Sequence, residues 1–291
     1  MRHNRDRLSR GALALLAFIS VGLLLFLVGF LLWQSLPALR EVGLKGLLDG
    51  EWRPVIYGDA PSYGLRNMLL TTLYVSALAL ALALVIGVGC SLFLVCSVSD
   101  RLRSVLLPAL ELLAGIPSVV YGFVGLYVVV RTLEKLGRPA GESILAGALV
   151  LSVMILPYII STCTSSMLQL RRRYESASAA LGTSRWYMAS QLILPASGRA
   201  VLASAALAAG RAMGETMAVM MVIGNAPIPP RLLGKGETVA ALIALEMGTA
   251  EVGSLHCSAL YAAGLGLLGL LLGVNLIVAL LRRKLRREGI L

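Results

Sequence analysis

The sequence predicts an all-α, polytopic membrane protein with six transmembrane helices. Of its 291 residues, 58% are hydrophobic and only 14% are charged, and the mean hydropathy is +0.84. Soluble domains are about 45–50% apolar and about 25% charged. The apolar residues gather in six runs of membrane-spanning length, and the segments between them alternate between basic and nearly balanced charge. These three observations exclude a water-soluble core.

Each run holds roughly 20 or more mostly apolar residues, the length that a helix needs to cross the hydrocarbon core. The first run extends from Gly11 to Trp33, which exceeds the apolar core of a signal peptide, and no small-residue cleavage site follows it. We therefore expect a retained helix. Pro117 and Pro157 interrupt two other runs, which is tolerated where neighbouring helices satisfy the freed backbone groups. The expected spans are 12–33, 69–96, 108–130, 144–166, 200–224 and 258–281.

The charges between the spans predict which side each segment faces. Arg and Lys outnumber Asp and Glu in the tail up to Arg10 and in segments 97–107, 167–199 and 282–291. The charges are close to balanced in segments 34–66, 131–143 and 225–257. Because basic segments stay in the cytoplasm, both termini are expected there. The net charge of +11 then reflects membrane topology and not nucleic-acid binding.

The sequence carries no pattern typical of catalysis, metal binding or nucleotide binding. Its cysteines form no CxxC pair and no metal-ligand spacing, and its two histidines stand apart from each other. No GxxxxGK[ST] phosphate-binding loop is present, so any nucleotide chemistry must come from a partner. We expect no covalent chemistry, no metal and no cofactor in this chain. These absences argue against one alternative, an intramembrane enzyme such as a lipid phosphotransferase.

The strongest functional signal is a pair of opposite charges inside the fifth expected span. Arg211 and Glu215 stand four residues apart in an apolar run from Ala200 to Ile223. At 1.5 Å per residue, Arg211 would lie about 16 Å from the cytoplasmic end, near the middle of a core about 30 Å thick. Charges at that depth usually face a protein interior or a water-filled path. Glu215 is expected one turn later on the same face, where a neutralising pair is the alternative role.

The cytoplasmic segment 167–199 is the second signal. Small helix-forming residues lead to Gly182, and the sequence LILP follows nine residues later, which predicts a short helix, a turn and a second short helix. A helical hairpin of this kind can dock into a groove of another protein. A solvated connector at the membrane surface is the alternative.

This segment resembles the cytoplasmic coupling motif of bacterial ABC importer permeases, which reads E-A-A, three residues, G, nine residues, I-x-L-P. Leu192 stands in place of the isoleucine, and Ser176 stands where the family has its glutamate. Glu175 comes one residue earlier, and one helical step turns a side chain by about 100°, so docking is assigned to the whole segment. The coupling residues that the resemblance implies are Glu175, Ser176, Ala177, Gly182, Leu194 and Pro195.

Two further stretches resemble the phosphate importer (Pst) permeases. One is residues 111–122, ELLAGIPSVVYG, and the other is residues 210–225, which are similar to PstC-type subunits and differ from their PstA-type sisters. The resemblance covers about residues 67–281 and implies the MetI-like transmembrane domain of type I ABC importers. Residues 1–66 would be a tail, a first helix and an extracytoplasmic loop, and residues 282–291 a basic cytoplasmic tail.

The resemblance implies that the deep charges belong to a substrate path. A guanidinium matches phosphate oxygens in bidentate geometry and stays charged at any biological pH. We hypothesise that Glu215 holds Arg211 while the path is empty and competes with phosphate for it. Glu111 is expected near the cytoplasmic end of the third span, as an interfacial carboxylate. The candidate path residues are Arg211, Glu215, Thr216, Ser118 and Tyr121; for the last three, helix packing is the alternative.

The resemblance also implies partners and a location. The chain would pair with a PstA-type sister permease in the bacterial cytoplasmic membrane, in contact with lipid. Two copies of an ATP-binding subunit would use ATP and Mg, and an extracytoplasmic phosphate-binding protein would deliver the substrate. The alternatives are an ABC permease for another oxyanion such as molybdate or sulfate, and a proton-coupled carrier in which Glu215 titrates.

Overall fold

The fold is built from long helices. The structure is a computed structural model that describes residues 2–54, 60–137 and 141–287, with side chains described only between Leu13 and Lys284; residues 288–291 of the expected basic tail lie outside it. Four single helices are long and apolar enough to cross a membrane: α1 (Arg2–Glu41), α3 (Arg66–Cys96), α7 (Ile144–Ala180) and α13 (Leu255–Arg287). Two pairs of helices bent at a break have the same property. With each pair counted as one span, the described residues hold up to six spans, although the second pair covers 185–214 and not the expected 200–224. The all-α fold class is confirmed.

The third expected span, 108–130, is broken near Pro117, the proline that interrupts its apolar run. Its parts are α4 (Asp100–Ala114), α5 (Ser118–Gly125), the π-helix η1 (Leu126–Val130) and α6 (Arg131–Lys135). The chain bends by 88° between α4 and the later parts. Pro117 is the N-cap of α5. Because proline has no N–H and disfavours the helical region for the residue before it, α4 cannot run through this point.

The fifth expected span, 200–224, is also broken. α10 (Gly198–Gly214) ends at Glu215, whose backbone is extended (φ −72°, ψ 125°), and α11 (Met217–Ile223) follows. At its other end, α10 is bent by 59° from the segment formed by α8 (Arg185–Tyr187), the π-helix η2 (Met188–Ile193) and α9 (Leu194–Ala196). The break changes the expected relation between Arg211 and Glu215, because the two residues no longer share one helix.

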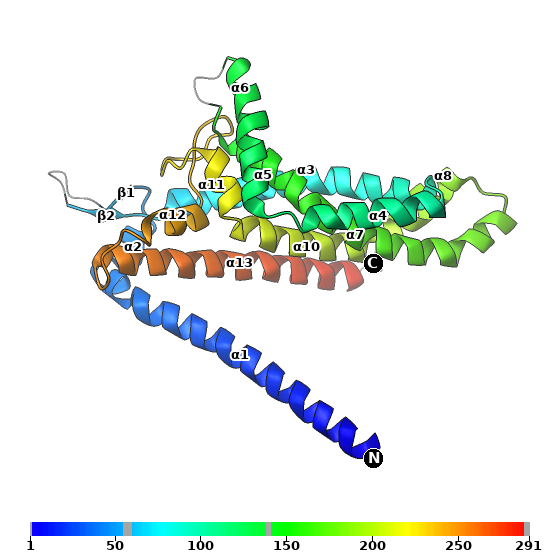
Figure 1. Ribbon diagram of the computed structural model, residues 1–291, viewed down its shortest axis with the longest axis horizontal. Coiled ribbons are helices and arrows are strands. Elements are labelled where there is room, and N and C mark those ends of the chain that lie inside the picture. The colour runs from blue at the N-terminus through cyan, green and yellow to red at the C-terminus, as the bar shows by residue number, and fades with distance from the viewer. Residues whose placement is uncertain (1, 55–59, 138–140, 288–291) are drawn as a thin grey trace.

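The main hydrophobic core lies between α3, α7 and α10, which run side by side in the bundle (Figure 1). Val75, Ile155 and Met167 are among its fully buried side chains. Gly87 allows α3 to approach α7 closely, since a Cβ atom at Gly87 would lie 2.7 Å from the side chain of Ile159. This core holds the elements that carry the candidate site.

The first helix behaves differently from the bundle. α1 packs against α13 near the end where α2 (Gly43–Leu47) begins, and then diverges from it toward the N-terminus (Figure 1). None of the most apolar 18-residue window of α1 is buried inside the protein. An apolar helix that is exposed around its circumference requires lipid or another membrane helix as its surroundings.

The segments expected outside the cytoplasm form a second, smaller core. The two-residue strands β1 (Trp52–Arg53) and β2 (Ser62–Tyr63) pair antiparallel, with Trp52 opposite Tyr63. Their aromatic rings pack with α12 (Val239–Glu246) and with the start of α13. Segment 34–66 therefore contains the end of α1, α2 and this hairpin, apart from residues 55–59, which lie outside the described ranges.

The expected cytoplasmic helical hairpin is present with longer bounds than the sequence predicts. α7 does not end at residue 166 but continues to Ala180, so the first helix of the hairpin is its extension. Gly182 has a φ of +66°, a conformation that glycine adopts without a Cβ penalty, and it makes the turn into α8.

Candidate functional site

At the break between α4 and α5 the carbonyl groups of Leu113 and Ala114 lose the helical donors four residues later, and a tyrosine hydroxyl donates to each of them. Tyr121, on α5, donates its hydroxyl to the carbonyl oxygen of Leu113 at 2.7 Å. Tyr158, on α7, donates its hydroxyl to the carbonyl oxygen of Ala114 at 3.1 Å. Unpaired carbonyls at a helix end need such donors. The tyrosines therefore fix the shape of this break.

The break between α10 and α11 places Glu215 differently from the sequence-based expectation. Oε1 of Glu215 accepts the backbone N–H of Ala218 at 3.2 Å, so the carboxylate satisfies one of the free donors at the start of α11. Thr216 donates its hydroxyl to the carbonyl oxygen of Gly214 at 3.4 Å. The expectation that Glu215 lies one helical turn after Arg211 on the same face was wrong, because the helix ends between them.

Arg211 lies in the last turn of α10, where a cation is favoured by the helix dipole. Its guanidinium carbon lies 4.4 Å from the centroid of the Tyr158 ring, a cation–π contact. Among the described residues, no hydrogen bond or ion pair of Arg211 is found, and the residue is exposed on the surface of the single chain. Its N–H groups are thus available to a ligand.

Glu111 lies in the last turn of α4, just before the break between α4 and α5. It accepts a hydrogen bond from the hydroxyl of Ser161 at 2.9 Å, which links α4 to α7 one helical turn from Tyr158. Glu111 is exposed. Glu111 therefore stands close to the break, and not at the start of α4 where the chain enters from the preceding loop.

The structure thus brings several of the predicted path residues to two neighbouring breaks. α11 packs against both α5 and α7, which carry the two tyrosines. Ser118 opens α5 directly after Pro117, and Thr216 lies between α10 and α11; both are half-buried. Tyr158 was not anticipated, since it stands in an apolar run and no motif or charge marks it in the sequence.

The predicted coupling residues lie at the far end of α7 and in the elements after it. Nη2 of Arg171 lies 2.9 Å from Oε1 of Glu175, so this carboxylate is engaged by its own helix. Ser176 and Ala177 are exposed, and Leu181 next to Gly182 is 80% exposed. Leu194 and Pro195 form the start of α9 and are also exposed.

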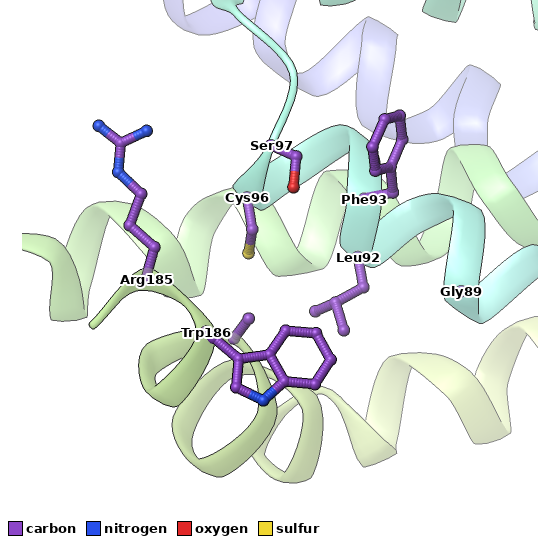
Figure 2. A pocket seen from close by; sticks show the side chains of 8 residues that line it. Gly89, Leu92, Phe93, Cys96, Ser97, Arg185 and Trp186 are labelled. Atoms are coloured by element: carbon purple, nitrogen blue, oxygen red, sulfur yellow. The ribbon is translucent and has the colours of Figure 1, made fainter. Parts of the chain in front are cut away.

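A cavity of about 580 Å³ lies at this same end of the bundle, between the end of α3 and α8 (Figure 2). Arg185 and Trp186 of α8 stand opposite Leu92, Phe93 and Cys96 of α3. A second cavity, of about 380 Å³, lies between α4 and α7, and a third, of about 460 Å³, lies between α7 and the segment from η2 to the start of α10. Arg211 lines none of these three cavities and is itself exposed.

A group of polar side chains at the opposite end was not anticipated from the sequence. Glu246 accepts the indole N–H of Trp52 at 3.1 Å and lies 2.7 Å from Nε2 of His256. Glu237, in the segment before α12, is 4% exposed. Burial, together with the nearby charge of Glu246, raises the pKa of Glu237 from 4.5 to about 7. This carboxyl is therefore close to half-protonated at neutral pH.

Several apolar helices of membrane-spanning length, with a helical hairpin that continues one of them, define a polytopic membrane protein. The chain belongs to the family described as the inner membrane component of binding-protein-dependent transport systems, whose model matches residues 79–287. It is accordingly a multi-pass inner membrane protein and the membrane subunit of an ABC transporter. Members of this family work with ATPase and binding-protein partners.

Several relatives match most of the chain. It is 32% identical over 300 residues to the phosphate transport system permease protein PstC of Xylella fastidiosa (strain Temecula1), covering 96% of this chain and 89% of that protein. It is 33% identical over 254 residues to the PstC of Mesorhizobium japonicum, with 80% and 75% covered. It is 35% identical over 227 residues to the probable ABC transporter permease protein YqgH of Bacillus subtilis (strain 168), with 77% and 73% covered.

A solved structure has the same fold. The inward-facing MetNI methionine ABC transporter aligns with a TM-score of 0.60, at 16% sequence identity, over 76% of this chain and 95% of that chain. At this identity the likeness supports the fold alone, and the predicted MetI-like architecture is confirmed.

Proposed function

We propose that this chain is one of two permease subunits of an ATP-driven importer and that it passes inorganic phosphate into the cytoplasm. The observation that carries the proposal is the similarity to proteins named as phosphate permeases across 96% of the chain. The geometry of Arg211 supports it, because an unpaired guanidinium beside two helix breaks offers the bidentate donors that a tetrahedral oxyanion requires. The chain itself carries out no covalent chemistry.

The exposure of the candidate site supports a two-permease assembly. Arg211 and Glu111 both lie on an open face of the single chain. A charge in a membrane needs a protein interior or a water-filled path around it. A PstA-type sister permease facing these residues would supply the other wall. A phosphate-binding protein would deliver the anion from the extracytoplasmic side.

The helical hairpin after α7 is the proposed contact with two ATP-binding subunits, which would hold ATP and Mg. Leu181 and Trp186 present large apolar surfaces on either side of the Gly182 turn. Glu175 is bound by Arg171, so docking is assigned to the turn and α8. With this segment in the cytoplasm, an even number of spans places both termini there too.

Transport by the reconstituted complex tests the proposal. The chain is purified with its sister permease and ATP-binding subunits, placed in proteoliposomes, and supplied with the phosphate-binding protein. We expect uptake of labelled phosphate that requires ATP on the side of the ATP-binding subunits and survives a protonophore. A complex in which the ATP-binding subunit cannot hydrolyse ATP is the control.

The competing functions give different outcomes. Uptake that collapses with the proton gradient and ignores ATP would establish a proton-coupled carrier. ATP-dependent uptake of molybdate or sulfate in place of phosphate, with the corresponding binding protein, would establish a permease for another oxyanion.

A further inference from the structure

Tyr158 connects three separate parts of the candidate site. It lies on α7, its ring faces the guanidinium of Arg211 on α10 at 4.4 Å, and its hydroxyl donates to Ala114 at the end of α4 at 3.1 Å. Pro157 and Ile159 on either side of it are buried, and Tyr158 itself is half-buried. The ring is therefore held from two directions, by its own helix and by the carbonyl that its hydroxyl binds.

Arg211 lacks comparable support elsewhere. Its helix ends three residues later, and the described residues offer its guanidinium no hydrogen bond or ion pair. Glu215, the acid nearest in sequence, is committed to the backbone of Ala218. An arginine side chain loses much rotamer freedom when it is fixed in one geometry. Without the ring, Arg211 would lose this rotamer freedom only when the anion binds.

A ring against one face of a guanidinium leaves the N–H edge unobstructed. The five N–H donors of arginine lie in the plane of the group, and bidentate contacts to oxyanions form in that plane. A ring on the face thus restricts how the group can tilt and does not compete with the anion for donors. In catalytic and binding sites, such support determines whether a side chain is held closely enough to its productive geometry.

We propose that Tyr158 is the positioning residue of the anion site, with its ring face setting the plane of the Arg211 guanidinium and the carbonyl of Ala114 setting the ring. The proposal rests on the proposed function and assigns that function a residue that no motif marks. Because Tyr158 also binds the end of α4, any movement of α4 during transport displaces the ring and with it the arginine.

The experiment uses the reconstituted complex and measures labelled phosphate imported per ATP hydrolysed. In Tyr158→Leu we expect this ratio to fall about tenfold, the loss that corresponds to a cation–π contact in a partly desolvated site. In Tyr158→Phe the ring remains but loses the hydrogen bond to Ala114 that sets it, and the ratio should fall by a smaller factor, about threefold. ATP hydrolysis stimulated by the binding protein should persist in both variants, which shows that the complex is assembled.

Tyr127→Leu is the matched control. Tyr127, on η1, faces another arginine, with the guanidinium carbon of Arg131 at 5.7 Å from its ring centroid, and it lies outside the two breaks. The same substitution there removes the same type of contact, and the ratio should remain at the wild-type value.

Two results would overturn the inference. The first is a Tyr158→Leu complex whose ratio equals that of Tyr127→Leu. The second is a Tyr158→Phe complex that loses as much as Tyr158→Leu, since the ring would then not be the cause. A wild-type complex that hydrolyses ATP but imports no phosphate would instead refute the proposed function, and the inference would fall with it.

Discussion

Glu215 shows at the scale of one residue how a backbone break redirects a side chain. Four residues separate it from Arg211, a spacing that in a helix would favour an ion pair. The helix ends at Gly214, and the carboxylate instead accepts the N–H of Ala218. The hypothesis that Glu215 competes with phosphate for Arg211 now requires the carboxylate to leave the start of α11.

Substitution of Glu215 separates these two roles. Glutamine keeps an oxygen that can accept from Ala218 but removes the charge, so Glu215→Gln should lower the rate of phosphate uptake more than the abundance of the complex in the membrane. Alanine also removes the acceptor, so Glu215→Ala should lower the stability by about 0.5–2 kcal/mol more. Uptake assays and quantitative blots on the same membranes measure both quantities. A glutamine variant that transports at the wild-type rate would refute a role for the charge.

The raised pKa of Glu237, at the end of the protein opposite the helical hairpin, predicts that the stability depends on pH. Glu246 faces it and is itself bound by Trp52 and His256, while Lys235 on the same segment pairs with Glu142. Since the pKa of Glu237 is raised in the folded protein, the folded state binds the proton more tightly than the unfolded state. Stability from this group is therefore complete below about pH 4.5 and is lost as the pH rises toward about 7.

Glu237→Gln should remove this dependence. The stability gap between the variant and the wild type should grow by about 3 kcal/mol in favour of the variant between pH 4 and pH 8. Thermal unfolding of the purified complex in detergent at several pH values measures the gap. Glu251→Gln, at an exposed carboxyl of the same external segment, is the matched control and should give parallel curves. A constant gap for Glu237→Gln would contradict the account.

At the scale of one element, the carbonyl groups at the end of α3 are bound by arginines. From the sequence alone, the basic residues of these segments were interpreted only as signals of membrane topology. The buried Arg103 donates to the carbonyl oxygens of Leu94, Val95 and Val98 at 2.7, 3.2 and 2.7 Å. Nη1 of Arg171 donates to Val95 as well, at 2.6 Å. These side chains supply the donors that the last turn of a helix lacks.

Arg103→Gln should therefore destabilise the protein much more than Arg101→Gln. Each carbonyl left buried without a donor costs about 1–3 kcal/mol. Arg101 is exposed in the same segment, and its substitution removes the same charge from the same side of the membrane. Thermal unfolding in detergent compares the two variants. Equal midpoints would show that the hydrogen bonds of Arg103 to these carbonyls add no stability.

The spans and their breaks differ in how well a sequence reveals them. The spans follow from hydropathy, because crossing a bilayer requires length and apolar composition. The breaks at Gly115–Pro117 and at Glu215 interrupt backbone direction within runs that remain apolar, so hydropathy averages over them. Pro117 partly indicated the first break. Glu215 was misleading for the second, because its spacing from Arg211 brings the two side chains together only if the helix continues.

The candidate site shows the same division. Arg211 was identifiable because a charge in an apolar run is costly and therefore has a reason to be there. Tyr158 was not, since tyrosine is common near the ends and interiors of membrane helices and its partners lie far away in the sequence. Only the packing of α4, α7 and α10 brings its ring to Arg211 and its hydroxyl to Ala114.

At the scale of the whole molecule, the single chain leaves two kinds of surface uncovered. α1 exposes apolar residues around its circumference and contacts α13 along only part of its length (Figure 1). The face with Arg211 and Glu111 exposes charges instead. Lipid suits the first surface, and the proposed sister permease would cover the second.

Uptake of labelled phosphate by complexes carrying Arg211→Lys tests the central claim most directly. Lysine keeps the positive charge and can keep the contact with the Tyr158 ring, but it lacks the planar fork that binds an oxyanion through two N–H groups. At matched abundance and matched ATP hydrolysis, we predict an uptake rate lower by about tenfold or more, because the bidentate contact is lost. An Arg211→Lys complex that imports phosphate at the wild-type rate would contradict the account.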